Sequence, residues 1–127
     1  MKPHPKKIEN VLRLDTQARC DYFVRKVADS EVVWGLFDTG WATGTSGGHT
    51  VIPFWPEEDF AVMCASSEWK NFHPKAIALD EFLSRWLPGM ETDGRICAVF
   101  PGTEGKGQLL SPQELLELIK HELEQYE

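Results

Sequence analysis

The sequence predicts an α+β fold, a mostly antiparallel sheet with helices packed on it. Two observations lead to this class. Runs of strand-like residues alternate along the chain with segments whose apolar residues recur every three or four positions, as on one face of a helix. Short glycine-rich turns join the first three strand-like runs. We therefore expect a three-strand meander, followed by further strands, with helices covering the sheet.

The first half of the chain predicts helices and then the meander. We expect residues 1–7 to form a loose arm, and Pro5 is suited to the first position of a short helix. Asp15 is a suitable N-cap for a helix over about residues 16–29. Pro53 is expected to end the pairing of the third strand or to place it at an edge. The three strands of the meander are predicted at residues 31–37, 41–45 and 49–54.

The second half alternates helices with short strands. Pro56 would begin a helix whose acidic first turn suits the positive end of the helix dipole. Asp80 is expected to cap the next helix, and the Pro-Gly pair at 88–89 to stop it. Residues 111–114 form a capping box that begins the last helix. The remaining strands are predicted at residues 74–79, 95–101 and 107–110, and residues 1–127 are most simply one domain.

Charge and cysteine usage limit the classes of partner and compartment. Acidic residues outnumber basic ones by 20 to 13, for a formal net charge of -7. This balance argues against nucleic-acid binding, which needs clustered Lys or Arg, and favours a basic partner. Three widely spaced cysteines without a CxxC pair are typical of a reducing compartment. With no signal peptide and no segment long enough to span a membrane, we expect a cytoplasmic protein.

Two glycine-rich stretches resemble catalytic motifs, but both are better explained as strand connections. Residues 44–48, GTSGG, match the G-x-S-x-G pattern of a nucleophilic serine. Strands are predicted on both sides of this run, however, whereas a nucleophile elbow joins a strand to a helix. Residues 102–107, GTEGKG, resemble a shortened phosphate-binding loop, but two residues separate the glycines where a P-loop needs four. A strand follows, so no helix N-terminus would face a phosphate.

The sequence predicts neither a metal site nor a cofactor. The four histidines are far apart, and the helix-spaced pair Glu117 and His121 lacks a third ligand. A pair of catalytic carboxylates is not predicted either, because the expected roles of Asp38 in a turn and of Asp80 as a helix cap already account for these two residues.

Tryptophan is the strongest functional signal, with five residues in the chain. Trp34 and Trp86 fit core stripes, whereas Trp41, Trp55 and Trp69 lie at strand ends or in loops, where indoles often mark an interface. The simpler alternative is that Trp55 and Trp69 only cover the helix of residues 56–66. The predicted partner-binding residues are Trp41, Trp55, Trp69, Lys70, Phe72 and Lys75.

The strings VWGLFDTGWA, VIPFWPEEDFA, WKNFHPKAIALDEFLSRWLPGMETDG and GKGQLLSPQELLE resemble the domain-of-unknown-function family DUF2750 over about residues 15–120. The resemblance implies a bacterial, cytoplasmic α+β domain and brings no catalytic residue. The order of elements is also distantly similar to the N-terminal domain of SseB-like proteins.

Three hypotheses for function remain open. The first is a non-enzymatic protein-interaction module, one concrete form being a toxin-neutralising immunity protein whose acidic surface covers a basic partner. The second is a small enzyme or ligand-binding protein with a groove near Asp38, Trp41, Ser46 and His49. The third is a housekeeping homodimer whose indoles face a second copy of the chain.

Overall fold

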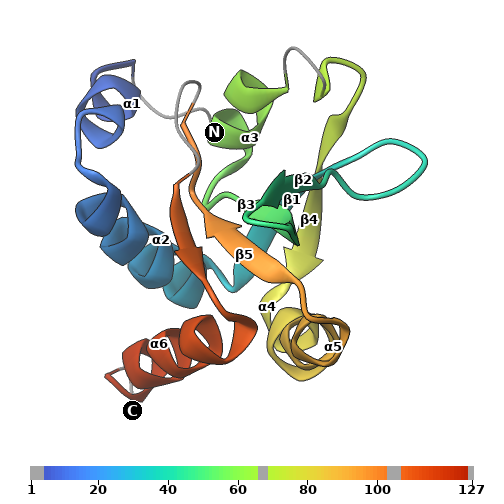
Figure 1. The fold of residues 1–127 in the computed structure, drawn as a ribbon. Coiled ribbons are helices and arrows are strands. Elements are labelled where there is room, and N and C mark those ends of the chain that lie inside the picture. The colour runs from blue at the N-terminus through green and yellow to red at the C-terminus, as the bar shows by residue number, and fades with distance from the viewer. Residues whose placement is uncertain (1–4, 66–68, 103–106, 126–127) are drawn as a thin grey trace.

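The computed structural model describes residues 5–65, 69–102 and 107–125 and confirms the α+β class (Figure 1). Helices and short strands alternate along most of the chain. In order, the elements are α1 (Pro5–Leu12), α2 (Thr16–Ser30), β1 (Val32–Phe37), β2 (Gly44–Ser46), β3 (His49–Phe54), α3 (Glu58–Cys64), β4 (His73–Ala78), α4 (Leu79–Glu81), the π-helical segment η2 (Phe82–Trp86), α5 (Leu87–Asp93), β5 (Ile96–Val99), β6 (Gln108–Leu110) and α6 (Pro112–Glu124).

The strands form two sheets. One is the antiparallel pair β1–β4, and the other has the order β2-β3-β5-β6. Among the described residues, β3 with β5 is the one parallel pair, and the other pairs are antiparallel. Within the described segments, one isolated bridge joins the two sheets: the backbone N–H groups of Trp34 and Trp55 each donate to the other residue's carbonyl, at N–O distances of 3.0 and 2.8 Å.

The predicted meander was wrong for its first strand. Only the β2–β3 hairpin forms, around Gly47 and Gly48, which both adopt positive φ. Strand β1 pairs instead with β4, some forty residues later in the chain. After β1 the chain makes only an isolated bridge, between Phe37 and Trp41, and then leaves the sheet. The segment from residue 38 to 43 therefore connects the two sheets instead of continuing a ladder.

Strand β3 is a central strand, so Pro53 does not place it at an edge, but its pairing with β2 ends before Pro53, as the alternative expectation had it. Pro53 itself pairs in register with Ala98 of β5, and β3 continues to Phe54. The ladder between β2 and β3 reaches only Val51, so the β2 side of Pro53 has no strand beside it. The missing N–H of proline therefore costs no ladder hydrogen bond on that side.

Helices begin at the residues predicted from the sequence where a side chain caps the helix. The Asp15 carboxylate accepts the Ala18 N–H at 2.8 Å and begins α2. At α6 the Ser111 hydroxyl accepts the Glu114 N–H, and the Glu114 carboxylate accepts the Ser111 N–H, which completes the predicted capping box. Two other helices begin at different residues from those predicted. Helix α3 begins at Glu58 and not at Pro56, and α4 begins at Leu79, one residue before the predicted cap Asp80. Helix α1 begins at Pro5, so the last part of the expected loose arm is helical; residues 1–4 lie outside the described residues.

The proline at position 88 does not stop its helix, contrary to expectation. Helical structure runs without a break from Leu79 to Asp93 and ends at Gly94, which has φ 71°. In a regular α-helix the proline ring clashes with the carbonyl four residues earlier, which here belongs to Ser84. The turn that contains Ser84 is π-helical, with the Leu87 N–H bonded to the Phe82 carbonyl. The wider turn accommodates the proline and allows the helix to continue.

One hydrophobic core connects the elements. Helices α2 and α6 pack against each other and against the β5–β6 end of the sheet, and α5 packs beside α6 (Figure 1). The helices bury one face each, as for Phe23 and Val27 of α2 and Leu115 and Ile119 of α6. No helix within the described segments is both long enough and apolar enough to cross a lipid bilayer.

Candidate functional site

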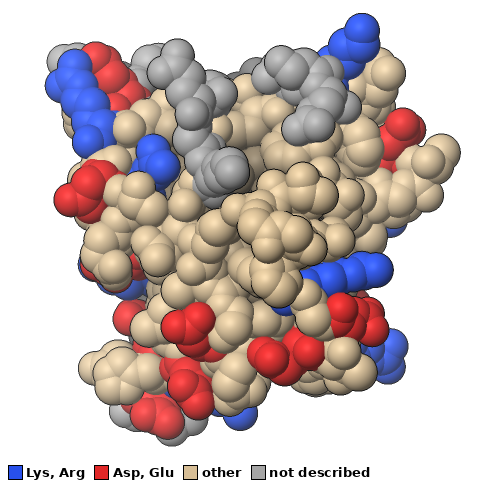
Figure 2. All heavy atoms as spheres, viewed as in Figure 1, with Lys and Arg blue, Asp and Glu red and all other residues tan. Residues whose placement is uncertain are grey.

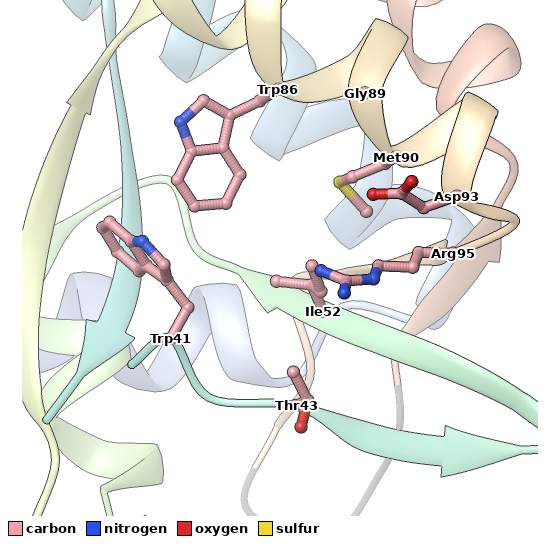
Figure 3. A pocket seen from close by; sticks show the side chains of 8 residues that line it. All are labelled: Trp41, Thr43, Ile52, Trp86, Gly89, Met90, Asp93 and Arg95. Atoms are coloured by element: carbon pink, nitrogen blue, oxygen red, sulfur yellow. The ribbon is translucent and has the colours of Figure 1, made fainter. Parts of the chain in front are cut away.

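A pocket of about 320 Å³ opens between β3, the segment that follows β1, and the helix formed by η2 and α5 (Figure 3). This volume is at the small end of the range for ligand sites, which runs from roughly 300 to 1,000 Å³. Its walls combine two indoles with aliphatic and sulfur-containing side chains and two charged groups. The lining residues are Trp41, Thr43, Ile52, Trp86, Gly89, Met90, Asp93 and Arg95.

Packing on several sides fixes the Trp41 indole. A Cβ atom on Gly35 would lie 3.0 Å from Cζ3 of Trp41, so the absence of a side chain in β1 makes room for the ring. The Phe37 ring packs edge-on at 5.1 Å. The Lys75 ammonium lies over both rings, 4.2 Å from the centroid of Phe37 and 5.6 Å from that of Trp41. Trp41 therefore presents a preformed wall to the pocket.

Trp86 is the second aromatic wall of the pocket and lies in edge-to-face contact with Trp41. Its ring centroid lies 4.7 Å from that of Trp41, with the ring planes at 85°, and the rings of Phe54 and Phe82 pack around it. Trp86 is the last residue of the π-helical segment, and such segments occur frequently at functional sites. The same local distortion that accommodates Pro88 thus contributes to placing an indole at the pocket.

The two charged residues of the pocket lie at the end of α5 and just beyond it. In the view of Figure 3 the Asp93 carboxylate and the Arg95 guanidinium lie on the side away from the indoles. Both residues are solvent-exposed, and within the described part of the chain neither side chain forms a hydrogen bond or an ion pair. The pocket therefore offers one positive and one negative group beside an apolar surface.

The surroundings of the pocket are acidic. Figure 2 shows Asp and Glu side chains gathered over the region of α5 and α6, where Glu91, Glu114 and Glu117 are exposed. Helices that carry net negative charge at the surface lower the local concentration of anions and raise that of cations. Arg95, and Lys75 at the Trp41 wall, are local exceptions to this field.

Of the groove residues predicted from the sequence, only Trp41 lines the pocket. Asp38 is exposed in the segment after β1, where its N–H donates to the Gly40 carbonyl. Ser46 and His49 face each other across the turn of the β2–β3 hairpin, and His49 is exposed. This arrangement supports the hairpin interpretation of residues 44–48, with strands on both sides of the turn.

Trp55, one of the predicted partner-binding residues, has a structural role instead. Trp55 has an exposed fraction of 0%, and its indole N–H donates to the Pro101 carbonyl at 3.0 Å. It cannot touch a partner while the fold is intact, so its assignment to a surface was wrong. Lys75 lies over the rings of Phe37 and Trp41. Its ammonium therefore supports the wall of the pocket.

The remaining predicted residues lie near a second apolar surface. Lys70 is exposed, while Trp69 and Phe72 are half-buried, and Trp69 packs edge-on against Trp55 at 6.3 Å. Helix α3 packs against β4, the strand that follows these residues, and exposes Val62 (51%) and Met63 (38%).

The cysteines are unsuited to nucleophilic chemistry. Burial raises the pKa of Cys97 to about 12 and that of Cys20 to about 11. Burial also raises the pKa of Cys64, although the hydrogen bond with Trp55 and the charge of Arg19 oppose this effect. The reactive form of cysteine is the thiolate, so all three side chains are unreactive thiols at neutral pH.

Metal-binding residues do not converge in the described part of the chain, where no three His, Cys, Asp or Glu side chains are placed to share an ion. His121 and Glu117 lie on the exposed side of α6, and the Glu117 carboxylate accepts a hydrogen bond from the Gln113 amide.

Sequence reasoning missed most of the pocket. Trp86 was assigned to a core stripe, and Asp93 and Arg95 had no predicted role. The available signal was the Pro-Gly pair at 88–89 within an otherwise continuous helical pattern, because such a pair implies either an end or a local distortion of the helix.

Comparisons with known proteins identify a family. The search of curated proteins and the search of solved structures gave no match. A family model described as "Protein of unknown function (DUF2750)" matches residues 20–119, a span that runs from α2 into α6 and includes the entire pocket. This match confirms the resemblance expected from the sequence motifs. The chain belongs to the DUF2750 family.

Proposed function

We propose that this protein is a binding protein that holds a ligand in the pocket lined by Trp41 and Trp86 without transforming it. The observation that carries the proposal is the pair of indoles, 4.7 Å apart, that packing fixes at the wall of a cavity of about 320 Å³. Rigid aromatic side chains lose little conformational freedom on binding and provide a large contact area.

The chemistry of the lining groups supports binding in preference to catalysis. Indole, thioether and aliphatic groups neither donate nor accept protons near neutral pH, and they make up most of the surface. Asp93 and Arg95 are solvent-exposed and carry opposite charges. These groups are suited to orient a ligand by charge.

Gly89 makes a selective test possible. It lines the pocket from α5, and a Cβ atom at this position would meet nothing within 4 Å. The substitution Gly89→Leu would therefore place a side chain in the cavity without a backbone clash. Thr92→Leu adds the same side chain to an exposed position of the same helix, outside the pocket lining, and is the matched control.

The experiment is a ligand-observed NMR screen of small fragments and metabolites. We expect ligands that bind the wild-type protein and Thr92→Leu but not Gly89→Leu, with all three proteins folded by circular dichroism. Ligands that bind Gly89→Leu as well as the wild type, or a library without any ligand, would refute the proposal.

A second candidate function is protein recognition by α3, because Val62 and Met63 are exposed beside the segment of Trp69, Lys70 and Phe72. The net charge of -7 favours a basic partner, as an immunity-type protein would have. Co-purification with a basic protein should be lost in Met63→Glu and retained in Leu109→Glu, which alters an exposed leucine on β6. A dimer dissociated by Met63→Glu in sedimentation experiments would favour a homodimer instead.

A further inference from the structure

We propose that the ligand of the Trp41–Trp86 pocket is a free α-amino acid with an apolar or aromatic side chain. This inference rests on the proposed function and adds the chemical class of the ligand. It follows from the position of two opposite charges beside an apolar cavity, and each part of the pocket accounts for one part of such a ligand.

The charges select a zwitterion. Arg95 supplies a guanidinium suited to a carboxylate, and Asp93 supplies a carboxylate suited to an ammonium. Both side chains are without an ion pair or hydrogen bond in the described part of the chain, so a ligand would not have to break an existing interaction. A ligand with only a positive charge would face Arg95 unfavourably, and one with only a negative charge would face Asp93 and the acidic surroundings.

The apolar walls select the side chain. Trp41, Trp86, Met90 and Ile52 surround the part of the cavity next to the charges (Figure 3). Indoles and a thioether make favourable contacts with aromatic and branched aliphatic groups. A volume of about 320 Å³ is small for a ligand site, which favours a compound the size of one amino acid over a longer chain.

Matched ligands separate the contributions of the two charges. L-Phenylalanine carries both charges, 2-phenylethylamine only the ammonium and 3-phenylpropionate only the carboxylate. We expect L-phenylalanine to bind about two- to fivefold more tightly than either analogue in isothermal titration calorimetry, because an ion pair with a solvent-exposed partner contributes a factor of about this size.

Protein variants assign each charge to a residue. Arg95→Met should weaken L-phenylalanine and 3-phenylpropionate but leave 2-phenylethylamine unchanged, and Asp93→Asn should weaken L-phenylalanine and 2-phenylethylamine but not 3-phenylpropionate. Arg85→Met, at an exposed position on η2 outside the pocket lining, should have no effect on any of the three. Both pocket residues are at the surface, so the variants should keep the wild-type melting temperature.

Failure of this inference differs from failure of the proposed function. If an analogue with one charge binds as tightly as L-phenylalanine, and Gly89→Leu abolishes that binding, the pocket is a ligand site but not one for amino acids. L-Phenylalanine and L-leucine that both fail to bind at millimolar concentration would also overturn the inference, whatever the fragment screen finds. L-Phenylalanine binding that Arg95→Met and Asp93→Asn do not change would overturn it as well.

Discussion

Replacing Trp55 by phenylalanine tests whether this indole stabilises the core, as its burial indicates, or serves a partner. The substitution removes the N–H that donates to the Pro101 carbonyl at 3.0 Å. An unsatisfied buried acceptor costs about 1 to 3 kcal/mol, and the Cys64 thiol, 3.4 Å from the same oxygen, would keep this cost near about 1. The smaller ring also leaves about three atoms' worth of space, which costs about 2 kcal/mol at roughly 0.8 kcal/mol per methylene-sized group.

The expected loss of about 3 kcal/mol in the free energy of unfolding corresponds to a fall of roughly 12 °C in melting temperature for a chain of this size. Differential scanning calorimetry measures this value directly. Trp69→Phe is the control, because that indole is half-buried and should cost less than about 1 kcal/mol. A Trp55→Phe protein that melts within about 3 °C of wild type would refute the argument that Trp55 is structural.

Three further predictions concern the pocket wall, the thiols and the last helix. Gly35→Ala should cost about 1 to 2 kcal/mol in urea unfolding and weaken ligand binding, because the new Cβ would lie 3.0 Å from the Trp41 ring; unchanged binding would show that the ring has room to move. Above pH 9 the free energy of unfolding should fall by up to about 1.4 kcal/mol per pH unit through Cys97, because its pKa is about 12 when folded and 9.0 when unfolded, so the unfolded chain loses its proton first. Cys97→Ala should have a shallower decline between pH 9 and 11, and equal slopes would contradict this. Ser111→Ala should lower the stability by about 1 kcal/mol, because Ser111 and Glu114 form the capping box of α6; a stability equal to wild type would mean that the box contributes nothing.

Local chemistry made part of the fold predictable. Asp15 and Ser111 each cap a helix through hydrogen bonds to residues three positions away, so a short window of sequence contains the whole interaction. The same holds for the turn of the β2–β3 hairpin, where Gly47 and Gly48 adopt positive φ.

Long-range pairing was not predictable in this way. The partner of β1 is β4, and the parallel neighbour of β3 is β5, so each pairing joins segments separated by two or more other elements. Strand-like residues indicate that a segment pairs but not with which segment, and the shortest connection was the wrong choice for β1.

The candidate site required the structure for a related reason. Its lining comes from the segment after β1, from β3 and from the helix of η2 and α5, which are remote in sequence. An indole at the end of a strand can lie in the hydrophobic core or at the protein surface, and the sequence around Trp41 and Trp55 does not distinguish these two positions. Trp55 is fully buried, whereas Trp41 is half-buried and lines the pocket.

The five indole N–H groups allow the central claim, that ligands bind in the pocket lined by Trp41 and Trp86, to be tested in one spectrum. Protein labelled with ¹⁵N at tryptophan gives a separate signal for each indole, which single Trp→Phe variants assign. During titration with a ligand from the fragment screen, the signals of Trp41 and Trp86 should move together, while that of the buried Trp55 stays fixed. A shift confined to Trp69, with Trp41 and Trp86 unchanged, would place the ligand elsewhere and contradict the claim.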